Sequence, residues 1–123
     1  EWKERGMEEG LEFSILTNTI TKAWSGKNIK EYKQHKGLKK ENLRDNMTNL
    51  ELVLNMLAEA TTTEISKEKQ PKSFLENQQI AQQGGQIAGT ARIEIEEKTG
   101  KSIISPKNAK QLKKCNSSNN LLN

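Results

Sequence analysis

Residues 47–60 read MTNLELVLNMLAEA and carry the clearest structural signal in the sequence. Thr48 stands where a helix N-cap is expected, and Glu51 follows three residues later, so the two side chains can form a capping box. Met47 can pack on Leu52 as a hydrophobic staple. Apolar residues then recur every three or four positions, which predicts a helix. Its apolar stripe comprises Leu50, Val53, Leu54, Leu57 and Ala60 or Thr61.

Leu52 and Met56 widen this stripe onto a second face. A helix that is apolar on more than one face usually lies inside a domain. We therefore expect this helix at the centre, with the other helices packed around it. It should run to about Lys69, because Pro71 cannot continue it.

The segments before the central helix also favour helix. Residues 1–10 predict a frayed helix or turn, and from Glu12 an apolar face recurs at helical spacing until Ser25-Gly26. That face comprises Phe13, Leu16, Ile20 and Ala23 or Trp24. Two short helices are expected next, one over 27–37 with Ile29, Tyr32 and His35 or Lys36 on one face, and one over 38–46 with Leu43 inward.

After Pro71, Ser73 and Glu76 predict a second capping box and a helix that ends at Thr99-Gly100. Gly84-Gly85 lies inside its pattern, so either the helix breaks there or another backbone comes close. Ile103 and Ile104 could form a lone extended segment. Ser105-Pro106 predicts a helix start, with a helix over 108–114.

These elements predict an all-α fold, a compact bundle of about five to seven helices around the central helix with little or no sheet. We expect residues 1–114 to form one helical domain, the C-terminal part of a longer protein, because Glu1 is not an initiator methionine. Residues 115–123 are rich in Asn and Ser and are expected to be a disordered tail.

Composition excludes several classes of function. One cysteine cannot form an internal disulfide, which fits the cytoplasm. The single cysteine and the single histidine together are too few to supply the ligands of a zinc site. No apolar run is long enough to span a membrane. We expect no metal, no cofactor and no small-molecule substrate.

No catalytic constellation is present in the sequence. Gly100-Lys101-Ser102 resembles the end of a phosphate-binding loop, but Ile95 occupies the position that needs glycine, and no strand precedes it. The glycines at 84, 85 and 89 fit close helix packing better than a dinucleotide site. Nothing forms a nucleophile, base and orienter set, so no enzymatic activity is expected.

The densest positive charge lies between residues 27 and 44, in a chain of net charge +4. Only Glu31 and Glu41 oppose it there, with Asp45 next to it. Such a segment can contact nucleic-acid phosphates, with Tyr32 as a stacking side chain, and the helix–Gly37–helix layout suggests a helix-turn-helix. A solvated lysine face remains the alternative. The candidate nucleic-acid-binding residues are Lys27, Lys30, Lys33, Lys36, Lys39, Lys40 and Arg44.

A set of positions between about residues 11 and 110 resembles the C-terminal region of the bacterial DNA-damage-inducible protein D family. The matching stretches are 31–33, 36–38, 42–47, 50–52, 59–62, 76–77, 84–85, 87–88, 91–92, 96, 99–101 and 105. The resemblance implies induction in the bacterial SOS response and association with the recombinase machinery or DNA. It implies no enzyme activity and names no site residues.

We therefore expect a non-enzymatic, cytoplasmic protein of the DNA-damage response that binds or modulates a recombinase–DNA filament or DNA. The alternative is a phage-antirepressor-like transcriptional regulator, in which this region is a dimerisation or DNA-contact domain. A homodimer is open in both cases.

Overall fold

The computed structural model describes the backbone of residues 2–112 and the side chains of residues 10–112. Its elements are α1 (Trp2–Ser25), α2 (Ile29–His35), the 3-10 turn η1 (Arg44–Asn46), α3 (Asn49–Lys69) and α4 (Phe74–Thr99). Residues 109–112 form one further helical turn, and the described residues contain no strand. The predicted all-helical bundle is confirmed. The tail expected at 115–123 lies outside the described residues.

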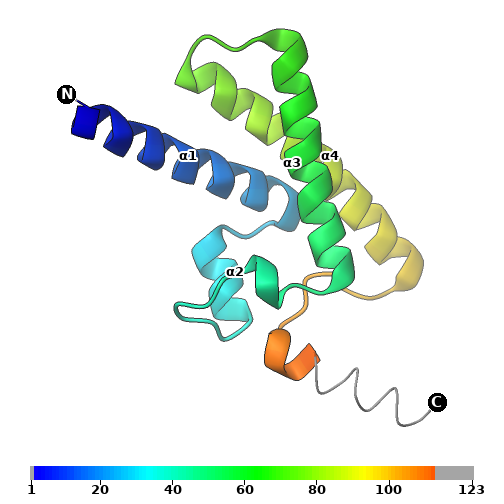
Figure 1. Cartoon of the computed structure of the whole chain (residues 1–123). Helices are drawn as coiled ribbons and strands as arrows, with labels where there is room; N and C mark the ends of the chain where they lie inside the picture. Colours follow the sequence, from blue (N-terminus) through cyan, green and yellow to red (C-terminus); the bar gives the residue numbers. More distant parts are fainter. Residues whose placement is uncertain (1, 113–123) are drawn as a thin grey trace.

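The helix that joins the others is α4, which packs along both α1 and α3 (Figure 1). α1 and α3 contact each other much less. α3 was expected in this place from its apolar sequence, and that expectation is wrong, because only one face of α3 packs on the bundle.

Three glycines allow α4 to lie between its neighbours. A Cβ atom on Gly84 would lie 2.7 Å from the backbone nitrogen of Thr62 in α3. On the next face, a Cβ on Gly85 would lie 2.8 Å from the carbonyl oxygen of Ile20, and one on Gly89 would lie 2.7 Å from that of Ala23. The helix therefore continues through Gly84-Gly85, and two other backbones come close there.

α3 begins as predicted, but its buried face differs from the predicted one. Thr48 and Glu51 form both hydrogen bonds of the capping box. The residues that face the bundle are Glu51, Leu54, Asn55 and Ala58. Leu50, Val53 and Leu57 of the predicted stripe are 41%, 58% and 39% exposed. The prediction failed because it excluded polar residues from the core, whereas Glu51 and Asn55 have buried hydrogen-bond partners.

α2 is confirmed, with a capping box between Asn28 and Glu31, but the second short helix is not. Over 38–46 only η1 is helical, and Leu43 is buried as expected. Side chains satisfy the backbone here instead: Glu41 accepts from the Lys39 amide at 2.7 Å, and Asn42 accepts from the Asp45 amide at 3.1 Å. Such local bonds compete with helix formation. The layout that suggested a helix-turn-helix is therefore absent.

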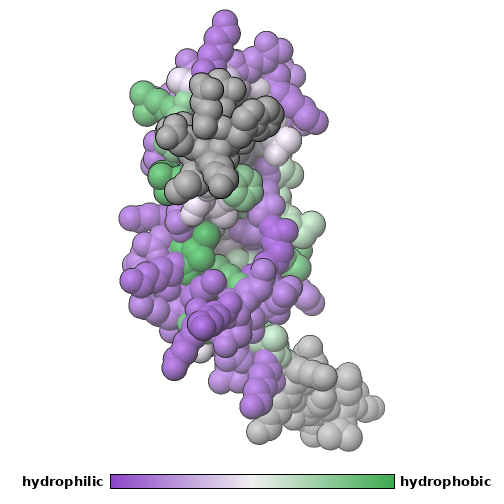
Figure 2. Space-filling model, turned by 60° about the vertical axis from the view of Figure 1, so that its left-hand side comes forward, coloured by the Kyte–Doolittle hydropathy of each residue, from purple (hydrophilic) through white to green (hydrophobic). Residues whose placement is uncertain are grey.

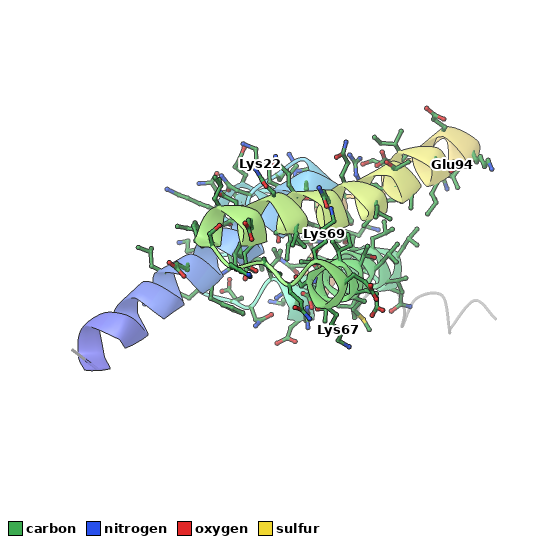
Figure 3. The ribbon with its side chains drawn as sticks, turned by 90° about the horizontal axis from the view of Figure 1, so that it is seen from above. Lys22, Lys67, Lys69 and Glu94 are labelled. Carbon is green, nitrogen blue, oxygen red and sulfur yellow. The ribbon has the colours of Figure 1, made fainter. Side chains whose placement is uncertain are left out.

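α3 ends at Lys69 as expected, where Gln70 takes a left-handed conformation. Viewed from above, Lys69 points toward α4 and Lys67 points away from it (Figure 3). Ser73 caps α4 by accepting from the Glu76 amide. The Glu76 carboxylate accepts from the Lys72 amide, so the predicted second capping box lacks its return bond.

The segment after α4 returns across the bundle to α2. Ile103 and Ile104 are buried in an irregular segment, and the amide of Ile103 donates to Glu96 at 2.9 Å. The next helical turn begins at residue 109, not after Ser105-Pro106, because Asn108 and Gln111 cap it reciprocally. Whether that turn extends to residue 114, as expected, lies outside the described residues.

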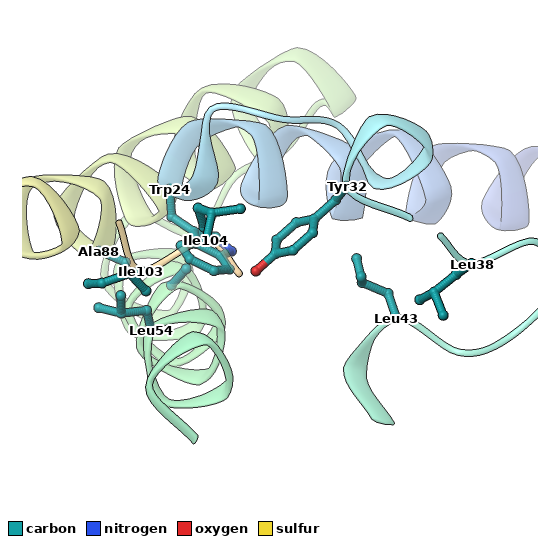
Figure 4. Packing of buried hydrophobic residues seen from close by; sticks show 9 residues of the cluster. Trp24, Tyr32, Leu38, Leu43, Leu54, Ala88, Ile103 and Ile104 are labelled. Atoms are coloured by element: carbon teal, nitrogen blue, oxygen red, sulfur yellow. The ribbon is translucent and has the colours of Figure 1, made fainter. Parts of the chain in front are cut away.

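The hydrophobic core joins α1, α2, α3, α4 and this returning segment. Trp24 and Tyr32 lie with ring centroids 6.0 Å apart, beside Ile104 (Figure 4). The core residues are Trp24, Tyr32, Leu38, Leu43, Leu54, Ala58, Ala88, Ile103 and Ile104. The core therefore lies at the end of the bundle that carries the basic segment.

Candidate functional site

Five of the seven predicted basic residues gather on and around α2. Lys30, Lys39 and Lys40 are exposed, and Lys27 and Lys33 are half-buried. We call the set Lys27, Lys30, Lys33, Lys39 and Lys40 the basic face. Lys30 and Lys33 stand on α2, Lys27 precedes it, and Lys39 and Lys40 follow the turn at Gly37. The structure thus brings these lysines onto one short helix and its flanking loops.

Lys36 does not belong to this face, which corrects the prediction. Its side chain is fully buried, and its Nζ lies 2.8 Å from the Glu51 carboxylate. The same Nζ donates to the carbonyl oxygen of Lys107 at 2.8 Å and lies 5.6 Å from the centre of the Tyr32 ring. Lys36 therefore cannot contact a phosphate without unfolding of this region. Its helical spacing from Ile29 and Tyr32 was the signal for burial.

Glu51 links three parts of the chain. Its carboxylate accepts from the Thr48 amide at 3.0 Å, from Lys36, and from the hydroxyl of Tyr32. Burial of Tyr32, reinforced by its hydrogen bond to Glu51, raises the pKa of the tyrosine above its usual range. These contacts hold α2 against the start of α3, and so they fix the position of the basic face.

Arg44 pairs with Glu59 of α3 across the molecule's surface, and both side chains are about half exposed. An exposed pair of this kind adds little stability, but it places a carboxylate beside the guanidinium. Arg44 therefore presents less net positive charge than the lysines of the basic face.

Two acidic residues lie among the lysines of the basic face, and the carboxylate of each accepts a hydrogen bond from a backbone amide. Glu31 accepts from the Asn28 amide at 3.2 Å, and Glu41 accepts from the Lys39 amide. Backbone hydrogen bonds at Lys39 and Glu41, with Lys33 and Lys39 nearby, lower the pKa of Glu41. The five lysines of the basic face exceed these two carboxylates in number.

The returning segment brings two more lysines, Lys107 and Lys110, to the edge of the basic face. Asn108 donates to the carbonyl oxygen of Lys36 at 3.3 Å, and the Ala109 amide donates to Asn46 at 2.7 Å. In Figure 1 this last turn lies beside the end of α2. Sequence reasoning missed these lysines, because no local pattern relates residues so far apart in the chain.

A groove lies next to the basic face, between α1, α2 and α3, with a volume of about 670 Å³. Phe13, Ile20, Ile29, Leu43 and Met47 supply apolar lining, and several threonines and asparagines supply polar lining. Lys33 lines it as well, so the groove and the basic face share that residue. Figure 2, taken from the side on which α1 and α2 come forward, shows hydrophobic surface enclosed by hydrophilic side chains.

The remaining sequence candidates have structural roles among the described residues. The glycines of α4 serve packing, and Gly100 ends α4 in a left-handed conformation. Within the described part of the chain, no group of His, Cys, Asp and Glu side chains could hold a metal ion. No described helix combines the length and hydrophobicity needed to cross a bilayer.

Comparisons with protein-family models, with curated proteins and with solved structures found no match for this chain.

Proposed function

We propose that this chain is a non-enzymatic protein of the bacterial DNA-damage (SOS) response, which binds DNA or a recombinase–DNA filament through the basic face. The protein would act by modulating the filament and not by chemistry of its own. The proposal places it in the cytoplasm, where the damaged DNA lies.

The basic face is the observation that carries the proposal. Its five lysines surround one short helix whose position is fixed from within by the buried Lys36–Glu51 pair. Lysines that are held in place by a rigid core can contact successive phosphates, and each contact releases condensed counterions. A polyanion is therefore the partner that this face fits best.

The resemblance to the DNA-damage-inducible protein D family supplies the biological setting. Several of its positions are those that build the support of the basic face. Glu51 holds Lys36, and Arg92 donates to the Trp24 carbonyl at 2.7 Å while pairing with Glu96. The resemblance thus supports the contacts that hold the basic face in place, and the charge of that face supports an anionic partner.

The test is a fluorescence anisotropy titration with labelled DNA and with recombinase filament at several salt concentrations. The triple variant Lys30→Ala/Lys39→Ala/Lys40→Ala should bind more weakly than the native protein. The slope of log affinity against log salt should flatten by about 0.7 to 0.9 for each phosphate that the variant no longer neutralises. Lys36 is left intact, because its removal would unfold the site.

The matched control is Lys67→Ala/Lys72→Ala/Lys98→Ala, which removes three other exposed lysines. Lys67 lies in the last turn of α3, Lys72 between α3 and α4, and Lys98 in the last turn of α4. Both triple variants lower the net charge from +4 to +1, since each removes three lysines. The control should keep the native slope. Equal weakening by both variants would mean that only net charge matters, and the basic face would not be the site.

The alternative, a dimerisation domain of a phage-type regulator, is favoured by a different feature. Leu50, Val53, Leu57 and Ala60 follow one another at intervals of three, four and three residues on the exposed side of α3. This is the spacing of a coiled-coil seam. A second copy of α3 could therefore cover the stripe.

Sedimentation equilibrium tests this alternative. A dimer should dissociate in the variant Val53→Glu, which leaves the monomer folded because Val53 is exposed. A native protein that stays monomeric at high concentration would rule the alternative out.

A further inference from the structure

The groove beside the basic face has one strongly exposed aromatic wall. Phe13 on α1 lines the groove and is 72% exposed. Leu11 on the same helix is 64% exposed but does not line the groove. An exposed phenyl ring at the mouth of a groove offers one free face to a flat ligand.

The polar lining of the groove can both donate and accept hydrogen bonds. The side-chain amide of Asn42 uses its oxygen to accept from Asp45, and its nitrogen has no partner among the described residues. The hydroxyl groups of Thr17 and Thr63 donate to their own helices, so their oxygens remain available as acceptors. Nucleic-acid bases present donors and acceptors together on their edges, and an apolar peptide side chain does not.

The charge of the lining selects an anion. The Glu59 carboxylate pairs with Arg44 and accepts a hydrogen bond from the side-chain amide of Asn55 at 2.9 Å. Lys33 lines the groove and forms no ion pair among the described residues. Lys30 stands on the adjoining solvent side of α2. A ligand with a flat ring in the groove would therefore place a negative group beside these lysines.

We propose that this groove binds an unstacked base of single-stranded DNA, with Phe13 as the stacking platform and Lys33 and Lys30 on the adjacent phosphates. The ligand is single-stranded because a groove wall reaches the face of a base only when that base has left the helical stack. The inference rests on the proposed function and deepens it, since it names the form of DNA and the residue that recognises it.

The experiment measures binding of Phe13→Ala to a labelled oligothymidylate, to an abasic strand of the same length and to a duplex. Loss of stacking on one base costs about 1–3 kcal/mol, so affinity for oligothymidylate should fall about 5- to 150-fold. The salt slope should not change, because every lysine that neutralises a phosphate is still present. Affinity for the abasic strand and for the duplex should stay at the native value.

Two variants serve as controls on the same helix. Phe13→Trp should keep or raise the affinity for oligothymidylate, because indole stacks at least as well as phenyl. Leu11→Ala removes another strongly exposed apolar side chain, one that lies outside the groove, and should bind like the native protein. Circular dichroism should show the native helix content in all three variants, since neither residue is buried.

The inference and the proposed function fail in different ways. If Phe13→Ala binds oligothymidylate with native affinity while the lysine variant has a flattened salt slope, the groove is not a base site and the basic face still binds DNA. If Phe13→Ala weakens binding to the abasic strand equally, the ring supports the fold or another contact and does not stack on a base. If the native protein binds none of the three strands, the base site is wrong and so is direct DNA binding by the basic face, and the filament titration alone then decides the proposed function.

Discussion

Glu51 shows how one side chain can serve several purposes at once. It caps α3, balances the charge of Lys36 and accepts from Tyr32, all in a site that excludes water. Removing one partner of a buried ion pair leaves the other charge unpaired, which costs about 3–5 kcal/mol. Lys36 is therefore needed for the fold, although the sequence groups it with lysines that face solvent.

Tyr32 should make the protein less stable as the pH becomes alkaline. Burial, and then Glu51, raise the pKa of its hydroxyl in the folded state, while in the unfolded chain it ionises near about 10. The stabilisation is complete below that pH and is lost as pH rises above it, by about 1.4 kcal/mol per pH unit, because only the unfolded chain releases the proton.

Tyr32 is the only tyrosine, so tyrosinate absorbance reports this one group. In the folded protein the absorbance should stay absent until alkaline unfolding, and the two transitions should coincide. In urea it should appear near about pH 10. Tyrosinate that forms in the folded protein at that same pH would show that Tyr32 is open to solvent.

At the residue scale, sequence reasoning found what is local. Thr48 and Glu51 were recognised because a capping box spans only four consecutive residues. The spacing of Tyr32 placed it on the face with Ile29, which agrees with its burial, but the stacking on nucleic acid expected of Tyr32 is wrong, because its side chain is fully buried. The contact between Lys36 and the Lys107 carbonyl joins residues 71 positions apart, and no local pattern encodes it. Lys36 was misassigned because charge alone does not distinguish a surface lysine from one that has a buried carboxylate.

At the scale of elements, α3 has its more apolar side toward solvent. The sequence predicts its helical state and its ends correctly, because caps and Pro71 define them. It misplaces the buried face, because Glu51 and Asn55 enter the core only through partners on other elements, Lys36 and Trp24.

The leucines of α3 test this assignment. Leu54 is 3% exposed and Leu57 is 39% exposed. Leu54→Ala should destabilise the protein by about 2–5 kcal/mol, because it removes buried volume. Leu57→Ala should cost less than about 1 kcal/mol in the monomer, as most exposed substitutions do.

Urea unfolding monitored by circular dichroism gives both values. Equal midpoints for the two variants would contradict the observed rotation of α3. A cost of Leu57→Ala that grows with protein concentration would instead show that a second copy covers this face.

The glycines of α4 provide a second test at this scale. Glycine to alanine in a helix ordinarily stabilises by about 1 kcal/mol, and Gly10 of α1 has nothing within 4 Å of its would-be Cβ. Gly10→Ala should therefore raise the unfolding midpoint. Gly85→Ala should lower it, because the new methyl would meet the Ala23 Cβ at 2.5 Å and the Ile20 carbonyl at 2.8 Å.

Thermal unfolding of the two variants measures both signs, since each makes the same chemical change. A Gly85→Ala protein more stable than the native one would exclude the close approach of α1 and α4. The sequence left this point open, because a glycine pair is equally compatible with a helix break.

In the whole molecule, the returning segment closes the core at the end that carries the basic face. Ile103 and Ile104 cover the cluster around Trp24 (Figure 4), and the chain then meets α2 through Lys107 and Asn108. The lysines and the groove are therefore held in place by residues from both halves of the chain. From the sequence this segment was ambiguous, since two isoleucines between glycine and proline form no periodic pattern.

A chain that ends after Gly100 should consequently be much less stable than the full sequence. Burial of each isoleucine contributes about 1.5–3 kcal/mol, and the ammonium of Lys36 would be without its carbonyl partner as well. We expect a lower unfolding midpoint and a red shift of Trp24 fluorescence, measured in a Trp2→Phe background so that Trp24 is the single reporter. A chain that ends after Leu112 keeps the contacts of Ile103, Ile104 and Lys107 named above, and it should therefore unfold at a higher midpoint than the chain that ends after Gly100. If the shorter chain keeps the native midpoint and emission, the segment does not close the core, and the basic face is supported by α2 and α3 alone.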